Sequence, residues 1–293
     1  MKRVVLYARS PEWQRAIERA GELVGGPHFH IIKSEGRTLA GFLDVPGTGR
    51  AFLKRADAPT WWSGILDRFR GSRASRALNG VAMLTAAGFS HAAPFAAMNV
   101  RRAGAVRESF LLSEPLERGD TLSRFALGPG GIKGRSDLRR RKRILDTVAR
   151  EVRRLHDANL YTRDMQETNL MVEDHADGSD AGGFRVYFLD LEDFRSARSV
   201  SWQRRMLNLV HLDRSVGRFL SRASRLDFLY TYLGGKPDRT SARRMVSEIL
   251  AIRGGVERPR ARIEANVSAA VPDTGKTRAS ATRSVPRNVR DRR

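Results

Sequence analysis

The chain has 293 residues, with 54 Lys plus Arg against 32 Asp plus Glu, a formal net charge of +22 and no cysteine. Its 41% of hydrophobic residues can bury a core, and its length suits one two-lobed domain or two small ones, which excludes a chain disordered throughout. The lack of cysteine excludes disulfide frameworks, thiolate zinc sites and cysteine nucleophiles, and it suits a reducing compartment. We expect neither an export signal nor a membrane span, because no apolar run is long enough for either.

The positive charge comes almost entirely from arginine, with 47 Arg against seven Lys. A genome rich in G and C raises Arg, Ala and Gly together, so base composition by itself accounts for part of the charge. A surface this positive also attracts polyanions such as nucleic acid, anionic lipid headgroups and phosphorylated sugars. The charge therefore narrows the partners to anions without choosing among them.

The first half of the chain combines helices with strands. Ser10 and Pro11 are an N-cap and first-turn pair that opens a helix ending near Leu23. Three strand-like runs follow, the last two joined by a Pro-Gly turn, and two later runs complete a small sheet. A helical pattern covers 73–87, with Gly88 as its C-terminal stop. The strand-like runs are Phe29–Lys33, Thr38–Val45, Ala51–Arg55, Phe95–Val100 and Ser109–Ser113, and a further helical pattern covers Trp61–Phe69.

The second half of the chain is mostly helical in its pattern. Apolar residues recur at helical spacing over Asp137–Asn159, which predicts a long helix with one buried face. His156 lies on that face and is expected to be a structural histidine. Two short strands, Leu170–Glu173 and Phe184–Leu189, and three helices within 200–253 follow. A sheet-rich part followed by a helical part predicts an α+β arrangement with a cleft between two lobes.

The polar loop after the long helix carries residues suited to chemistry. Asp164 and Asn169 lie five residues apart across this loop, and the second short strand leads to Asp190. An Asp as base, an Asn as neutral oxygen ligand and a second Asp as anionic ligand are the set that phosphoryl transfer from Mg·ATP requires. The Arg-Asp-x4-Asn pattern alone is common by chance. Here a helix precedes it, strands flank it, and Lys54 stands upstream on a strand.

At these residues the chain resembles the protein-kinase-like superfamily. Thr162-Arg163-Asp164 stands where that superfamily has His-Arg-Asp, Asn169 holds its Asn position, and Asp190 stands at its metal-binding Asp. Phe52-Leu53-Lys54 resembles the strand that ends in the phosphate-contacting lysine, and Ser109–Leu116 resembles the hinge between the lobes. The resemblance implies a two-lobed protein-kinase-like fold, with a small sheet-rich N-lobe and a mostly helical C-lobe.

The resemblance narrows to the lipopolysaccharide kinase (Kdo/WaaP) family, whose members phosphorylate sugars of the inner core. It covers roughly residues 29 to 235. The stretches that carry it are Arg70–Ala77 leading into Leu84–Gly88, then Ser109–Leu116, Leu207–Leu209, Arg214-Ser215 and Phe228–Gly234. The expected organisation is 1–28 as an N-terminal extension, 29–116 as N-lobe and hinge, 117–254 as helical C-lobe, and 255–293 as a disordered basic tail.

The resemblance also implies roles for the polar residues. Asp164 would orient and deprotonate an acceptor hydroxyl. Asn169 and Asp190 would hold Mg²⁺, and Lys54 would contact the phosphates of ATP. Together these roles imply an Mg²⁺-dependent kinase that transfers the γ-phosphate of ATP to a hydroxyl group.

The adenine and the acceptor are implied by the same resemblance. The backbone near Glu114 and Leu116, in the hinge, would take the adenine of ATP. The acceptor would be a sugar hydroxyl of an anionic, lipid-linked glycan. The expected location is cytoplasmic, with peripheral contact to an anionic membrane surface at the inner face of the cell membrane, where each nearby Lys or Arg contributes about 1 kcal/mol of attraction.

Two departures from the kinase pattern leave other functions open. Asn79 stands where kinases place the helix glutamate that pairs with the lysine, and the turn Ser34–Arg37 is not a G-x-G-x-x-G loop. One alternative is therefore a pseudokinase that binds nucleotide without turnover. A protein-Ser/Thr kinase, or an antibiotic or choline-type kinase, would share the catalytic residues. A protein that binds nucleic acid or another polyanion would explain the charge, although no helix-turn-helix or zinc spacing is present.

Overall fold

The computed structural model describes residues 1–58, 70–127, 135–175, 183–252 and 254. Met1–Ile249 form one compact unit and Leu250–Arg293 form another. The helix predicted over Trp61–Phe69 and the tail predicted over 255–293 lie outside the described residues. Within those residues, no helix is both long enough and apolar enough to cross a membrane.

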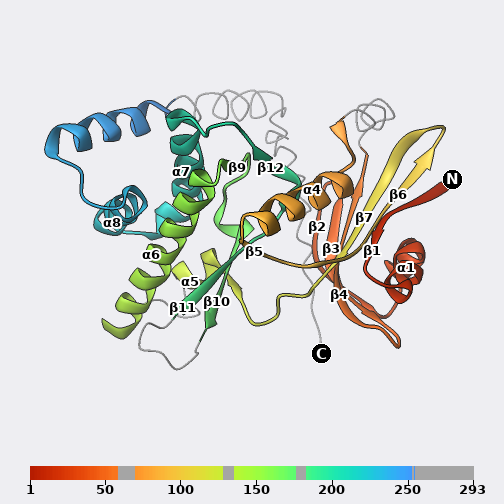
Figure 1. The fold of residues 1–293 in the computed structure, drawn as a ribbon. Coiled ribbons are helices and arrows are strands. Elements are labelled where there is room, and N and C mark those ends of the chain that lie inside the picture. The colour runs from red at the N-terminus through yellow and green to blue at the C-terminus, as the bar shows by residue number, and fades with distance from the viewer. Residues whose placement is uncertain (59–69, 128–134, 176–182, 253, 255–293) are drawn as a thin grey trace, which may run out of the picture. The chain divides into compact units, whose positions relative to one another are not determined.

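The first half of the larger unit is an antiparallel sheet of six strands in the order β1-β6-β7-β4-β3-β2 (Figure 1). All five strand-like runs of the sequence are strands in this sheet, and Thr38–Val45 has the predicted ends. Edge strands are therefore β1 and β2. The six strands are β1 (Lys2–Ala8), β2 (Phe29–Glu35), β3 (Thr38–Val45), β4 (Gly49–Asp57), β6 (Pro94–Arg102) and β7 (Ala105–Ser113).

The predicted N-terminal extension, residues 1–28, contributes strand β1 to this sheet. Strand β1 pairs with β6 from Lys2 to Ala8, and α1 (Pro11–Glu18) packs on both strands. The single helix predicted here is divided into α1 and α2 (Ala20–Leu23) at Arg19. The sequence did not identify β1 because its strand character depends on a partner strand far along the chain.

Alternate residues of the central strand β4 face opposite sides of the sheet. Ala51 and Leu53 lie in the hydrophobic core together with Ile17 of α1. Phe52 and Lys54 instead line a cavity on the other side. The sheet therefore separates a closed apolar core from a face on which a charged side chain is available to a ligand.

Helix α4 (Arg73–Ala86) packs on β6 and β7 and ends before Gly88, whose φ of +71° confirms the predicted stop. The helix also packs on the short 3₁₀ turn η2 (Leu191–Asp193). The two backbones meet at Gly80, where an added Cβ would lie 2.1 Å from the Leu191 carbonyl oxygen. This contact fixes the segment after Asp190 against the N-terminal half.

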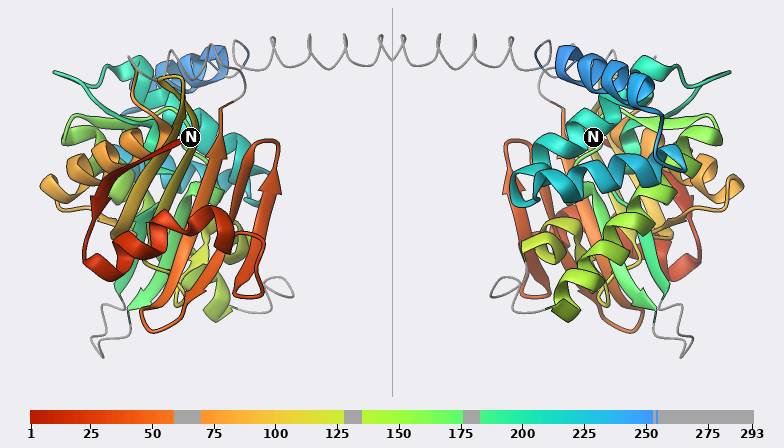
Figure 2. Two further views of the ribbon diagram at one scale, coloured as in Figure 1. Left: turned by 90° about the vertical axis from the view of Figure 1, so that its right-hand side faces the viewer. Right: turned by 90° about the vertical axis from the view of Figure 1, so that its left-hand side faces the viewer.

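The second half of the unit is built on a long helix, α6, which packs against α8 and against β11 (Figure 2). Strands β10 and β11 form an antiparallel hairpin extended by β8 and β5, and β9 pairs with β12. The predicted long helix, two short strands and three later helices are all present, the third helix covering 239–252. The elements are β5 (Ser90–His91), β8 (Asp120–Thr121), α5 (Leu122–Leu127), α6 (Arg135–Asp157), β9 (Leu160–Thr162), η1 (Glu167–Asn169), β10 (Leu170–His175), β11 (Gly183–Phe188), β12 (Phe194–Ser196), α7 (Trp202–Val216), η3 (Gly217–Phe219) and α8 (Arg222–Leu233).

The close contact at Gly80 makes a testable prediction. We expect Gly80→Ala to lower the free energy of unfolding by about 1–3 kcal/mol, because the new methyl group meets backbone that cannot rotate away. Gly21→Ala is the matched control, since nothing lies within 4 Å of a Cβ at that position. Urea-induced unfolding of both variants measures the effect, and an equal change in the two would contradict the contact.

Candidate active site

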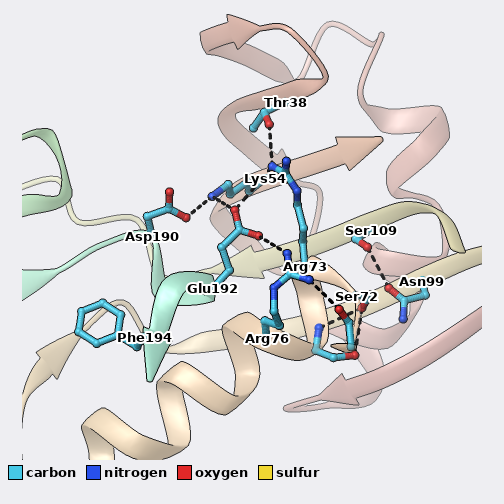
Figure 3. A network of polar contacts seen from close by, with 12 residues as sticks. Thr38, Lys54, Ser72, Arg73, Arg76, Asn99, Ser109, Asp190, Glu192 and Phe194 are labelled. Atoms are coloured by element: carbon cyan, nitrogen blue, oxygen red, sulfur yellow. Dashed lines mark hydrogen bonds and ion pairs between the residues drawn. The ribbon is translucent and has the colours of Figure 1, made fainter. Parts of the chain in front are cut away.

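Lys54 lies with its ammonium group between two carboxylates. Its Nζ donates to Asp190 Oδ1 at 2.5 Å and to Glu192 Oε1 at 3.3 Å (Figure 3). Burial by itself would lower the pKa of Lys54, but the charges of Asp190 and Glu192 outweigh burial and hold the pKa above its ordinary value. Lys54 is therefore a fixed positive charge, and the structure brings this predicted site residue together with Asp190.

Glu192 is a site residue that the sequence reasoning missed. It is only 7% exposed, and besides Lys54 it is approached by Arg73 at 3.6 Å and Arg76 at 3.8 Å. Asn79, which the sequence placed opposite Lys54, is instead exposed, because α4 turns its neighbour Gly80 toward η2. The carboxylate that kinases carry on the helix is thus supplied here from the segment that follows Asp190.

Asp190 has a backbone conformation that is uncommon for a residue with a side chain, with φ 51° and ψ 57°. Such strain persists only where the surroundings enforce it, and it concentrates at functional sites. The preceding residue, Leu189, donates its N–H to the Asn169 carbonyl at 2.9 Å. This bond joins the segment carrying Asp190 to the polar loop, so two predicted metal ligands lie on neighbouring segments.

Asp164 and Asn169 are held together at the two ends of the polar loop. The Asn169 amide nitrogen donates to the Asp164 backbone carbonyl at 3.0 Å and to its Oδ2 at 3.1 Å. The Gln166 amide donates to the other carboxylate oxygen of Asp164. Because Asn169 turns its nitrogen toward Asp164, its amide oxygen is the atom available to a cation.

A buried polar chain anchors this loop to three helices. His156 is fully buried, with Nδ1 2.8 Å from the Tyr232 hydroxyl and Nε2 3.1 Å from Asn208 Oδ1. The Asn208 amide nitrogen donates to the Thr162 carbonyl at 2.8 Å, so its oxygen must accept from His156 Nε2. Burial lowers the pKa of His156 to about 4, which keeps the ring neutral and Nδ1 an acceptor for Tyr232. The structural role expected for His156 is confirmed.

A cavity between the sheet, α4 and the end of β11 is lined by Lys54, Asp190 and Glu192. Neither Glu114 nor Leu116 is among the described residues that line it. Glu114 instead closes the end of β7, donating its N–H to the Ala93 carbonyl at 2.8 Å. The other lining residues are mostly apolar; they are Phe52, Ala56, Arg73, Ala74, Ala77, Val81, Ala92, Pro94, Ser109, Phe110, Leu111, Ser113, Phe188, Leu189 and Leu191.

The ion pairs around Glu192 make the second prediction. Glu192→Gln should lower the free energy of unfolding by about 2–4 kcal/mol, because Lys54, Arg73 and Arg76 would lose the buried carboxylate that they share. Asn79→Ala is exposed and should change the free energy of unfolding by less than about 0.5 kcal/mol. Urea unfolding of both variants distinguishes the two candidate partners of Lys54, and a larger loss in Asn79→Ala would favour the helix position.

The buried histidine makes the third prediction. Its pKa is about 4 in the folded protein against 6.5 for an unperturbed histidine, so the unfolded chain takes up the proton first. Stability is therefore complete above about pH 6.5 and falls as the pH decreases toward 4, by on the order of 3 kcal/mol from this group. Urea unfolding at several pH values should give a flatter profile for His156→Gln. The matched control is His28→Gln, at an exposed position, which should leave the profile as in the wild type.

A family model and several solved structures match this chain. A solved structure described as WaaP in complex with acyl carrier protein is similar in fold, with a TM-score of 0.60 at 20% identity, covering 88% of this chain and 99% of that one. A Rio2 kinase from Chaetomium thermophilum gives a TM-score of 0.48 at 12% identity, covering 83% and 76%. No curated protein matches the chain in sequence. The model of the lipopolysaccharide kinase (Kdo/WaaP) family matches residues 65–232, more than half of the sequence, and the chain belongs to this family.

Proposed function

We propose that this protein is an ATP- and Mg²⁺-dependent kinase that transfers the γ-phosphate to a sugar hydroxyl of an anionic, lipid-linked glycan. One observation carries the proposal. In a chain of the lipopolysaccharide kinase family, Lys54 and Asp190 are paired, Asp164 and Asn169 are paired, and the bond from Leu189 to Asn169 joins the two pairs. A lysine, an acid and an amide oxygen beside a second acid are what phosphoryl transfer requires.

The cavity suits a nucleotide because its walls differ in character. Apolar side chains such as Phe52 and Leu111 line most of it, which suits a planar base, and Lys54 adds a positive charge for the phosphates. Glu114 and Leu116 keep their proposed role as backbone contacts of the adenine at the end of β7. The Glu114 N–H already donates to the Ala93 carbonyl, so Glu114 would offer its backbone carbonyl and Leu116 its backbone groups.

Asp190 and Asn169 are the residues proposed to hold Mg²⁺. Among the described residues there is no group of three or more His, Cys, Asp or Glu able to hold a metal ion. A set of one carboxylate and one amide oxygen nevertheless fits Mg²⁺, which keeps several waters and takes further ligands from substrate phosphates. When bound, the ion neutralises charge on the phosphate oxygens.

Asp164 is proposed to act on the acceptor. Its carboxylate orients the sugar hydroxyl and accepts the proton as the hydroxyl oxygen bonds to the γ-phosphorus, while the bond from that phosphorus to the bridging oxygen breaks and ADP leaves. Gln166 now donates to this carboxylate, and the acceptor hydroxyl would take its place. Asn169 holds the Asp164 carboxylate and backbone in position through its two hydrogen bonds.

The proposed location is the cytoplasmic face of the cell membrane. The charge of +22 suits an acceptor and a lipid surface that are both anionic, because positive side chains near such a surface are attracted to it. The observed pairing of Lys54 with Glu192 removes one ground for a pseudokinase, which was the neutral Asn79 opposite the lysine. The turn poor in glycine still separates this chain from other kinases.

The fourth prediction tests the proposed base. Asp164→Asn should lower the rate of phosphate transfer by about 10²- to 10⁴-fold, because the amide cannot accept the proton. Nucleotide affinity should stay within about two-fold, since Asp164 does not line the cavity. Asp174→Asn is the matched control, because Asp174 pairs with Arg140 at the far end of β10 and should leave transfer unchanged.

The measurement is transfer of labelled γ-phosphate from Mg·ATP to a deacylated lipopolysaccharide core, to a generic protein substrate, and without acceptor. Label in the sugar fraction that depends on Asp164 supports the proposal. Label in protein would favour the protein kinase alternative. Nucleotide binding with no transfer to any acceptor would favour a pseudokinase, and equal transfer by Asp164→Asn would refute the role of this residue.

A further inference from the structure

The turn between β2 and β3 lacks what usually holds nucleotide phosphates. In kinases a glycine-rich loop covers the phosphates at this point. Here the turn has one glycine, Gly36, with φ +56°, and it follows Glu35, whose carboxylate pairs with Lys33 at 2.7 Å. The turn therefore lacks the repeated glycines that let several backbone amides approach a phosphate. A nucleotide in the cavity needs another donor beside Lys54.

Arg73 of α4 reaches the end of this turn and could supply such a donor. It is the first residue of α4 and lines the cavity together with Lys54. Its Nη1 donates to the Thr38 hydroxyl at 3.2 Å and lies 3.6 Å from Glu192 Oε1 (Figure 3). Thr38 begins β3 directly after the turn. The Arg73 guanidinium thus lies between Glu192, which pairs with Lys54, and Thr38, at the strand end where kinases have the glycine-rich loop.

The charges around Arg73 favour an anion. The cluster holds three cationic side chains, those of Lys54, Arg73 and Arg76, against the two carboxylates of Asp190 and Glu192. A guanidinium has five N–H donors in a planar fork that matches two phosphate oxygens. The contacts of Arg73 with a neutral hydroxyl and with Glu192 at 3.6 Å leave donors for a ligand.

The nearby Arg76 contacts the protein backbone instead of the cavity. Arg76 donates to the Gly71 carbonyl at 2.7 Å and is only 21% exposed in its side chain, compared with 41% for Arg73. It does not line the cavity. Arg76 therefore holds the start of α4 and the Glu192 carboxylate, while Arg73 is exposed to a ligand.

We propose that Arg73 binds the β- and γ-phosphates of the nucleotide, so that a side chain replaces the backbone amides of a glycine-rich loop. The inference rests on the proposed function and adds a phosphate-binding residue to it. Thr38 positions the guanidinium, and Glu192 keeps it beside Lys54. The affinity for nucleotides should then depend on the number of phosphates through Arg73.

The test compares the binding of adenosine, AMP, ADP and ATP by calorimetry in the full-length protein. Arg73→Ala should weaken ATP binding by about 10- to 100-fold and leave adenosine binding unchanged, as expected for a charge-assisted hydrogen bond to phosphate. Thr38→Val, which removes only the anchor, should weaken ATP binding by about 2- to 10-fold. Arg73→Lys keeps the charge without the fork and should fall between the alanine variant and the wild type.

Arg37→Ala is the matched control for charge. Arg37 is next to Thr38, but its guanidinium donates to the Ala58 carbonyl at 3.0 Å and does not line the cavity. It should change ATP binding by less than about two-fold. ATP binding by Arg73→Ala equal to that of the wild type, or equal losses for adenosine and ATP, would overturn the inference and leave the kinase proposal standing. A wild-type protein that binds no nucleotide would overturn both. If Arg73→Ala does not fold, Thr38→Val and Arg73→Lys decide the question.

Discussion

The site depends on one backbone contact, that of α4 with the 3₁₀ turn after Asp190. Gly80 lets the helix reach the Leu191 carbonyl, and this approach brings Glu192 to Lys54. A buried carboxylate is costly unless it is paired, so Glu192 and its cationic neighbours need one another. The charge balance of the site therefore depends on the packing of α4 against η2.

The polar loop is fixed independently of that contact. Three helices hold it through His156, Asn208 and Tyr232, and the chain of hydrogen bonds ends on the Thr162 carbonyl. Each group in the chain has a partner, and a network satisfied in this way in a low-dielectric interior favours a single arrangement. The ion pairs of Glu192 hold the residues on the face of the sheet, and the His156 network holds the loop. The hydrogen bond from Leu189 to Asn169 links the two.

Two elements of the kinase pattern that are absent from this sequence have counterparts in space. The helix glutamate is replaced by Glu192, which reaches Lys54 from η2, the turn packed on α4. The glycine-rich loop has its proposed counterpart in Arg73. In each case the chemistry needs a group of a certain kind at one place in the site. That group can come from different segments of the chain. A departure from a sequence motif is therefore weak grounds for assigning loss of function.

The local elements, and the residues spaced within one loop, follow from the amino-acid sequence alone. The alternation in Thr38–Val45, the helical spacing in α4 and α6, and the need for a positive φ at Gly88 are properties of neighbouring residues, so they could be read directly. The pair Asp164 and Asn169 follows from a spacing of five residues. Other features arise only from long-range contacts. Strand β1 forms by pairing with β6, and Glu192 contacts Lys54 across a separation of 138 residues. Such contacts join segments far apart in the chain, and a local pattern does not record which segments will meet.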